Sequence, residues 1–138
     1  MTKEQLFLDI LHYLEINSDL FIDVKRDNRR KSTSVLIKDN GELVITYNSK
    51  DFRTYLHVFH TAYHEFGHLI YKDDETTQYN LVYAEYMAER WQLDHLKIDF
   101  PKAYKYQCER GKKQVIDWGT NFINDPHYVA WKMIKEYN

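Results

Sequence analysis

The sequence has little cysteine, proline or glycine: its 138 residues include one cysteine, two prolines and four glycines. The single cysteine, Cys108, cannot form a disulfide within the chain, and no neighbouring motif favours a catalytic thiolate there. Because proline and glycine are scarce and no repeat or low-complexity tract is present, the sequence indicates no linker. We therefore expect a single domain over residues 1–138, a length that can bury a hydrophobic core.

The sequence also lacks a strong net charge and a long apolar run. Its formal net charge of −2 provides no basic field for direct binding of nucleic acid, and the basic run at residues 25–31 is expected to be a solvated loop. No stretch approaches the roughly 18 apolar residues of a membrane span, and the N-terminal residues do not resemble a signal peptide. These absences favour a cytoplasmic protein that does not bind membranes, and they leave its oligomeric state open.

Hydrophobic periodicity indicates a mainly helical domain, because apolar residues recur every three or four positions in several segments. The helices that this spacing predicts cover residues 3–16, 50–72, 77–97, 102–110 and 126–137. Asn48 or Ser49 is expected to cap the second of these helices. The third helix carries apolar residues on nearly all sides, so we expect it to be central and largely buried.

A small β-hairpin is expected before the second helix. Residues 33–38 and 42–47 contain many β-branched side chains, and the turn-forming run Asp39-Asn40-Gly41 lies between them. The glycine of this run can adopt the positive φ angle that such a turn needs. The sequence therefore predicts an α+β domain in which a small antiparallel sheet precedes a long helix.

The chemically informative part of the sequence is the run His64-Glu65-Phe66-Gly67-His68. Residues four apart on a helix project from the same face, so His64 and His68 can bind one metal ion. Glu65 lies beside this pair and can take a proton from an attacking water. The alternatives are two core histidines or two surface histidines without a role. Core histidines are disfavoured because both residues fall away from the centre of the expected apolar stripe.

A catalytic zinc ion needs a third protein ligand and an open position for water. Glu85 and Glu89 lie four apart in a helix that is otherwise apolar, and the burial of an unpaired carboxylate is costly. A metal ion would stabilise one carboxylate, and the second N–H group of a ligating histidine would stabilise the other. The alternative is that both pair with basic side chains such as Arg90 or Lys97. Further candidates for the third ligand are Asp73, Asp74, Glu75 and His95.

Attack of such a water on a carbonyl group would also need a donor that stabilises the oxyanion of the tetrahedral intermediate. The candidates for this role are His60, Tyr83, His95 and His127. His60 also lies four residues before His64, but a metal site built on that pair would leave the spacing of Glu65 unexplained. His12 and His57 are expected to be structural or to face solvent.

Three segments resemble the ImmA/IrrE-type metallopeptidases, which are encoded by bacteria, phages and integrative elements. Residues 41–48 resemble the family's strand that ends in asparagine before the metal helix. Residues 59–68 resemble its aromatic-x-x-Ala-x-His-Glu-x-Gly-His signature, and residues 85–91 resemble its Glu-x-x-Ala-Asp/Asn-x-Phe segment. The resemblance covers about residues 40–96.

This resemblance implies a zincin-like metallopeptidase domain that binds one zinc ion. Carried over position by position, it makes His64, His68 and Glu85 the zinc ligands, Glu65 the general base and Glu89 a carboxylate that supports a ligand. The implied substrate is a protein, such as a helix-turn-helix repressor of a phage or mobile element. Two other functions stay open: a non-hydrolytic antirepressor that uses zinc to hold its fold, and a zincin-like toxin or effector.

Overall fold

The computed structural model describes residues 1–118, 125–126 and 132 of the chain. Within this part, the elements in chain order are α1 (Lys3–Ile16), β1 (Ile22–Arg26), β2 (Ser34–Ile37), β3 (Leu43–Tyr47), α2 (Tyr55–Ile70), α3 (Glu75–Tyr79), α4 (Leu81–Asp99) and α5 (Pro101–Trp118). A small sheet thus precedes the helix that carries the histidine motif, and the predicted α+β class is confirmed. Among the described helices, none combines the length and the apolar character that a membrane span requires.

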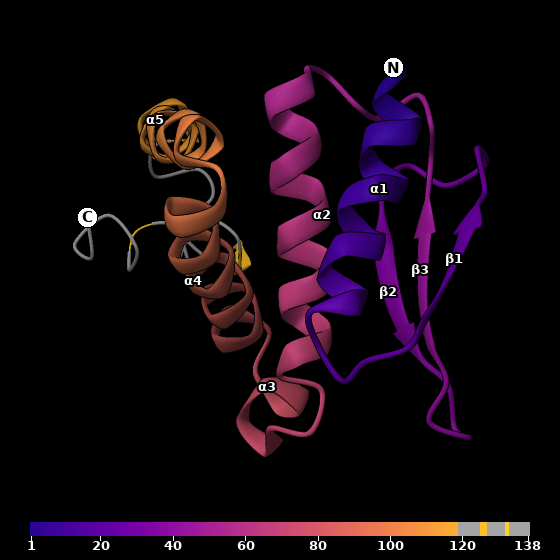
Figure 1. Ribbon diagram of the computed structural model, residues 1–138. Helices are drawn as coiled ribbons and strands as arrows, with labels where there is room; N and C mark the ends of the chain where they lie inside the picture. The colour runs from indigo at the N-terminus through magenta and orange to yellow at the C-terminus, as the bar shows by residue number, and fades with distance from the viewer. Residues whose placement is uncertain (119–124, 127–131, 133–138) are drawn as a thin grey trace.

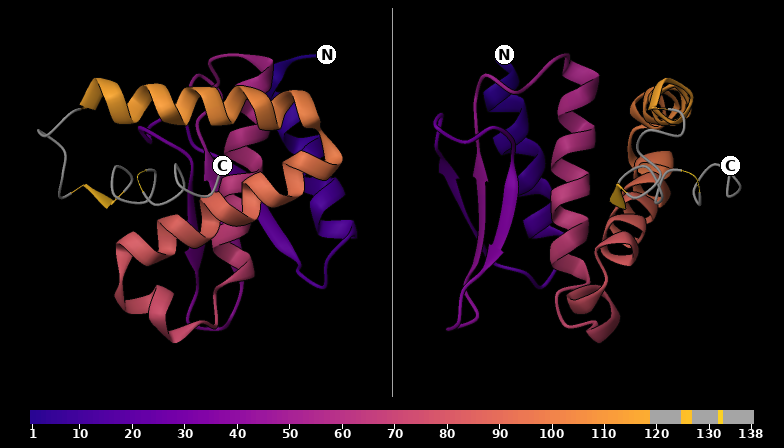
Figure 2. Two further views of the ribbon diagram at one scale, coloured as in Figure 1. Left: turned by 90° about the vertical axis from the view of Figure 1, so that its left-hand side faces the viewer. Right: turned by 180° about the vertical axis from the view of Figure 1, so that it is seen from behind.

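The elements form three layers (Figure 1). The sheet is the first layer, α1 and α2 pack side by side over one of its faces, and α4 and α5 lie on the opposite side of α2. The view from behind shows the same order of layers (Figure 2). Because helices flank α2 on both sides, α2 is the central helix of the domain. The prediction that the third helix would be central is wrong: α4 lies in an outer layer, with Leu81 72% and Ile98 81% exposed.

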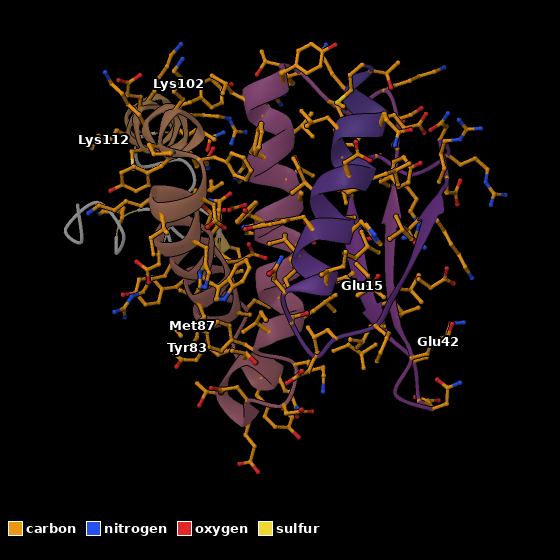
Figure 3. The ribbon with its side chains drawn as sticks, in the orientation of Figure 1. Glu15, Glu42, Tyr83, Met87, Lys102 and Lys112 are labelled. Atoms are coloured by element: carbon orange, nitrogen blue, oxygen red, sulfur yellow. The ribbon has the colours of Figure 1, made fainter. Side chains whose placement is uncertain are left out.

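The sheet has the strand order β1-β3-β2, with β1 parallel and β2 antiparallel to β3. The predicted hairpin is confirmed: Lys38 N donates to the carbonyl oxygen of Glu42 (2.9 Å), and Gly41 has a φ of 86°. Glu42 lies at this end of the sheet (Figure 3). β1 is not among the elements expected from the sequence. Because β3 takes the central position, β2 is left at an edge of the sheet.

Aromatic side chains join α1 to the sheet and to the loop before α2. The ring of Phe7 lies 5.1 Å from that of Tyr47 and 4.9 Å from that of Phe52, measured between centroids. The Tyr47 hydroxyl donates a hydrogen bond of 2.8 Å to Glu4. Burial and this bond raise the pKa of Tyr47 to about 12. These contacts fix the first helix and thereby complete the layer beside α2.

Capping side chains explain where α2 begins. The sequence predicts a start near residue 50, but the first helical residue is Tyr55, because Thr54 Oγ1 accepts a hydrogen bond of 3.1 Å from His57 N and so caps the helix. Asn48, one of the two residues expected to be the cap, instead donates its side-chain amide to the carbonyl oxygen of Arg30 (2.7 Å). It therefore stabilises the basic loop between β1 and β2. Residues 28–31 of this loop are exposed, as expected, but Lys25 and Arg26 of the run predicted as a loop (25–31) belong to β1.

The third and fourth predicted helices also differ from the structure at their boundaries. The predicted helix 77–97 is divided into α3 and α4 at Asn80, whose side chain accepts a hydrogen bond of 3.0 Å from Tyr83 N and caps α4. The predicted helix 102–110 is the first half of the longer α5. The predicted helix 126–137 lies outside the described residues, apart from two positions.

The backbones of the two helices that carry the motif residues approach each other closely at Gly67 and Ala88. A Cβ atom added to Gly67 of α2 would lie 2.9 Å from the carbonyl oxygen and 3.1 Å from the Cα atom of Ala88 in α4. The glycine and the alanine therefore allow a near contact of the two backbones. His64 lies three residues before Gly67, and His68 lies one residue after it. Glu85 and Glu89 have the same positions relative to Ala88. The contact thus brings both pairs of side chains to one place.

We predict that Gly67→Ala destabilises the protein and weakens metal binding. Alanine would gain roughly 1 kcal/mol of helix propensity, but relief of the overlap with Ala88 forces the helices apart, at a cost of about 1–3 kcal/mol. Metal affinity should fall by about tenfold or more because the support of the ligands is displaced. Urea unfolding and metal competition titrations measure the two effects.

Gly41→Ala is the matched control for this prediction. Its added Cβ meets no atom within 4 Å, but the φ of 86° makes the substitution strained. It should lower the free energy of unfolding by about 1 kcal/mol and leave metal affinity unchanged. A Gly67→Ala variant that binds metal as tightly as the wild type would contradict the account.

Candidate metal centre

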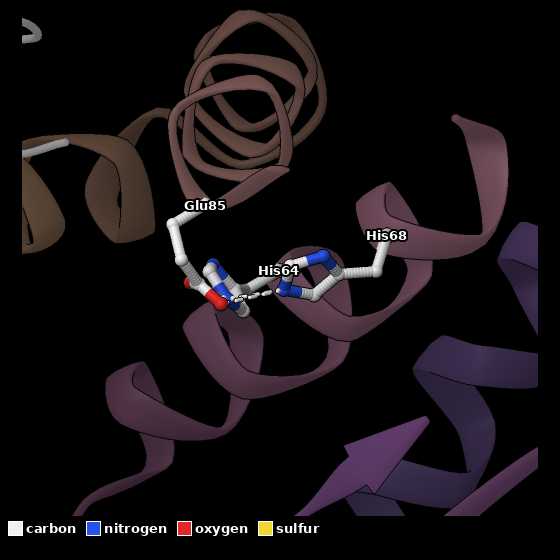
Figure 4. Close-up of side chains that lie close together, drawn as sticks. All are labelled: His64, His68 and Glu85. Carbon is white, nitrogen blue, oxygen red and sulfur yellow. Dashed lines mark hydrogen bonds and ion pairs between the residues drawn. The ribbon is translucent and has the colours of Figure 1, made fainter. Parts of the chain in front are cut away.

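Three side chains from two helices converge beside the Gly67 contact. His64 and His68 project from α2, and Glu85 projects toward them from α4 (Figure 4). The Nε2 atom of His64 lies 3.0 Å from Glu85 Oε2, and that of His68 lies 3.3 Å from Glu85 Oε1. The two Nε2 atoms are 3.1 Å apart. Each residue thus offers one ligand atom to a common point.

The spacing of these atoms fits a metal ion. Ligands at about 2.0–2.1 Å from a tetrahedrally coordinated ion lie about 3.3 Å from one another. The two Nε2 atoms are 3.1 Å apart, and each lies 3.0 or 3.3 Å from a different oxygen of the Glu85 carboxylate, so these separations lie close to that value. Two imidazoles and a carboxylate are also a donor set that divalent metals accept. His64, His68 and Glu85 could therefore hold a metal ion.

The other candidates for a third ligand lie elsewhere. Asp74 caps α3 by accepting from Thr76 N (2.8 Å), and Asp73 forms an ion pair of 2.7 Å with Lys72. Glu75 is exposed at the start of α3. The ring of His95 stacks on Trp91, with centroids 4.1 Å apart. None of the four belongs to the group that could hold a metal within the described residues.

Glu89 supports the group from behind. Its carboxylate is only 2% exposed and forms an ion pair with Nδ1 of His64, the ring nitrogen opposite the proposed ligand atom. Its second oxygen accepts hydrogen bonds from the side-chain amides of Gln92 (3.0 Å) and Gln107 (3.5 Å). A carboxylate in this position orients a ligating imidazole and strengthens it as a ligand.

The alternative pairing of Glu89 with nearby basic side chains is wrong. In the part of the chain that the structure describes, Glu89 forms its ion pair with His64, and the Nδ1 atom of His60 lies 3.8 Å from the same carboxylate. Arg90 lies over the ring of Tyr86, and Lys97 lies over another tyrosine ring. The buried carboxylate is thus stabilised by imidazoles and amides rather than by a lysine or arginine.

The electrostatic balance of the group keeps the carboxylate of Glu89 charged. Burial disfavours the charged form of His64, but Glu89 and Glu85 outweigh it, so the pKa of His64 is well above its ordinary value. Burial also raises the pKa of Glu89, but His64 and His60 outweigh it, so that pKa is lowered. The protein therefore provides a negative environment that favours a cation at this place.

An open cleft of about 520 Å³ lies beside the group. The three potential ligands and Glu65 line one side of it, and Ser34 and Val35 of β2 line another. Arg110 and Gln114 of α5 also contribute to its wall. The group that could hold a metal is therefore accessible to a molecule in the cleft, and the carboxylate of Glu65 lies in the same space.

Three of the four candidate oxyanion donors lie within the described residues. His60 lines the cleft, and its Nδ1 contacts the side-chain oxygen of Gln92. Burial lowers the pKa of His60 to about 3, so its ring is neutral. Tyr83 does not line the cleft, because residues two apart on a helix point in nearly opposite directions and Glu85 faces it. His95 lies outside it too, ten residues further along α4, and His127 lies outside the described residues.

Two histidines of the motif helix, His57 and His64, are buried, and for His64 this differs from expectation. The helical-wheel argument that placed His64 away from the core fails, since the residue is only 6% exposed. The reason is that α2 is covered on two sides, so its buried face extends well beyond one apolar stripe. His12 and His57 were each expected to be structural or to face solvent. His57 is structural, with 6% of its surface exposed, and His12 faces solvent.

Residues of α5 form a part of the site that the sequence analysis misses. Gln107 is fully buried against Glu89, and Arg110 and Gln114 follow it on the same side of the helix, with spacings of three and four. The periodic polar face was a usable signal, but only its packing against α2 and α4 shows that it points inward.

The chain matches no protein-family profile, and neither a curated protein nor a solved structure shows significant similarity to it.

We predict that the protein binds close to one divalent metal ion per chain. His68→Ala and Glu85→Ala each remove one of the three ligand groups and should lose most of the metal, as measured by elemental mass spectrometry after dialysis. Asp73→Ala and Glu75→Ala are matched controls, which should retain it. If metal persists in Glu85→Ala but is lost from either control, the third ligand does not lie on α4 and the assignment of Glu85 is contradicted.

We predict a second effect, on stability, from His57. Burial lowers the pKa of His57 to about 4, whereas the unfolded chain takes up this proton near the ordinary value of 6.5. The stabilisation by the neutral ring is complete above pH 6.5 and is lost as the pH falls toward 4, by up to about 3 kcal/mol. His57→Leu should therefore reduce the loss of stability on acidification.

Urea unfolding between pH 7 and pH 4.5, with EDTA present to remove metal linkage, measures this effect. The exposed His12→Leu variant is the control and should keep the wild-type pH profile. An unchanged profile in His57→Leu would refute the role assigned to this ring.

Proposed function

We propose that this protein is a zinc-dependent endopeptidase. The observation that carries the proposal is that three potential metal ligands and a glutamate, Glu65, line one open cleft that residues of an edge strand also line. The order His64-Glu65-x-x-His68 on a helix provides two ligands and an adjacent proton acceptor, which is the arrangement that hydrolysis by an activated water requires.

Zinc is the metal that we propose for the group. Two imidazoles and one carboxylate, with a fourth position left open, form the ligand set of catalytic zinc sites. A structural zinc site is closed by four protein ligands, whereas the group within the described residues has three members. This difference favours an enzyme over a binding protein that uses zinc only to hold its fold.

Each residue then has a defined task. His64, His68 and Glu85 would hold the ion, which when bound lowers the pKa of water and polarises the scissile carbonyl. Glu65 accepts the proton of the attacking water and returns it to the leaving amine. Glu89 fixes the orientation of the His64 ring through its Nδ1 atom. Among the oxyanion candidates that lie within the described residues, His60 lines the cleft.

The edge strand supports a peptide as the substrate. In the described part of the chain, β2 pairs with β3 alone, so its other edge has backbone groups available for an extended chain. Ser34 and Val35 of this strand line the cleft that holds the metal group. An extended peptide that adds to β2 by strand pairing would pass in front of the ligands.

The identity of the substrate is a further part of the proposal. We infer that it is a regulatory protein of the cytoplasm, such as a helix-turn-helix repressor of a phage or mobile element. This inference rests on the resemblance of residues 59–68 and 85–91 to the ImmA/IrrE-type metallopeptidases.

The decisive variant for hydrolysis is Glu65→Gln. Glutamine keeps the size of the side chain but cannot accept the proton, so peptide cleavage should fall by roughly a hundred- to ten-thousand-fold while metal content stays unchanged. Cleavage of a quenched-fluorescence peptide library by zinc-loaded protein measures the activity.

Glu42→Gln on the β2–β3 turn is the matched control and should keep full activity, because Glu42 does not line the cleft. Equal activity in Glu65→Gln and wild type, or a zinc-loaded wild type that cleaves no peptide, would count against the proposed function.

A further inference from the structure

A second cavity adjoins the cleft on the side of α5. It has a volume of about 450 Å³, and two of its lining residues, Arg110 and Gln114, also line the metal cleft. The two spaces therefore border the same two side chains. The other residues that line the second cavity are Arg53, Tyr106, Glu109 and Lys113.

This cavity holds an excess of positive charge. Arg53, Arg110 and Lys113 contribute three cationic groups, and Glu109 contributes one exposed carboxylate. Within the described residues, no ion pair joins any of the three basic side chains to a carboxylate; Arg110 has one weak hydrogen bond, of 3.5 Å, to Gln107 Oε1. The guanidinium donors thus keep most of their hydrogen-bonding capacity for another molecule.

The environment of Arg110 makes this arrangement costly without an anion. Its side chain is half-buried, and burial, together with the neighbouring Arg53, lowers the pKa of Arg110. Glu89 attracts it at longer range. A bound anion would relieve the repulsion between the two guanidinium groups and replace the lost hydration.

Arg110 is also connected to the metal group through side chains. It donates to Gln107, Gln107 donates to Glu89, and Glu89 pairs with Nδ1 of His64. This chain of contacts, whose first two hydrogen bonds are long at 3.5 Å, places Arg110 behind Glu89 and thus near the potential ligands. An anionic group held there would belong to the same molecule as a peptide bond that lies in front of them.

We propose that Arg110 and Arg53 form a subsite that binds a carboxylate of the peptide substrate beside the metal centre. The inference rests on the proposed endopeptidase function and adds the substrate class: peptides with a carboxylate near the bond that is cleaved. The planar fork of an arginine matches the two oxygens of a carboxylate, which favours this ligand chemistry. The carboxylate can come from an Asp or Glu side chain or from the C-terminus of the peptide.

A binding experiment separates the subsite from catalysis. Zinc-loaded Glu65→Gln protein is titrated with fluorescein-labelled alanine-based peptides, and anisotropy reports the dissociation constants. One set carries a single glutamate at varied positions with an amidated C-terminus, a second set carries glutamine at the same positions, and a third has glutamine and a free C-terminus. We expect the best glutamate peptide, or the free C-terminus, to bind about tenfold or more tightly than its neutral match.

Variants test whether the two arginines cause the preference for acidic over neutral peptides. Arg110→Gln in the same background should abolish it, and Arg53→Gln should reduce it. Lys112→Gln is the matched control, since Figure 3 shows Lys112 on the outer side of the same helix, and the preference should remain. Metal content and urea unfolding of each variant establish that the fold is intact.

The possible outcomes distinguish a failure of the subsite proposal from a failure of the endopeptidase proposal. Equal binding of acidic and neutral peptides, no measurable binding of any acidic peptide, or a preference that survives Arg110→Gln in folded protein would overturn the subsite. A preference that depends on Arg110 in a protein that never cleaves a peptide would support the subsite and remove the endopeptidase function instead.

Discussion

The near contact of α2 and α4 at Gly67 and Ala88 is the constraint on which the metal centre depends. A residue with a side chain at position 67 would place its Cβ atom 2.9 Å from a backbone oxygen, so only glycine allows the helices to meet this closely. Glycine in a helix costs about 0.5–1 kcal/mol relative to alanine. The close packing of the two helices that glycine permits offsets this cost. His64 and His68 on one helix, and Glu85 and Glu89 on the other, meet across it.

The network behind the potential ligands extends this constraint to a third helix. Glu89 is a buried carboxylate that needs several partners, and it obtains them from α2, α4 and α5 through His64, Gln92 and Gln107. The same chain of contacts reaches Arg110, which also lines the cleft. The position of the ligands, the support of His64 and the charge of the neighbouring cavity are thus parts of one packed arrangement of helices.

Local signals in the sequence were sufficient for some elements and not for others. The Asp39-Asn40-Gly41 turn and the i, i+4 spacing of His64 and His68 act over a few residues, so they could be read directly. β1 could not, because a short strand with polar residues forms only through its pairing with β3. The central place of α2, the burial of His64 and the inward polar face of α5 depend on tertiary packing, which no single segment encodes.

The most direct test of the account is X-ray absorption spectroscopy at the zinc edge of the zinc-loaded protein. If His64, His68 and Glu85 hold the ion, the first shell contains two imidazole nitrogens at about 2.0–2.1 Å, with the remaining ligands oxygen at about 2.0–2.2 Å. A first shell with sulfur, or with fewer than two imidazoles, would contradict the assignment and with it the role given to the contact between α2 and α4.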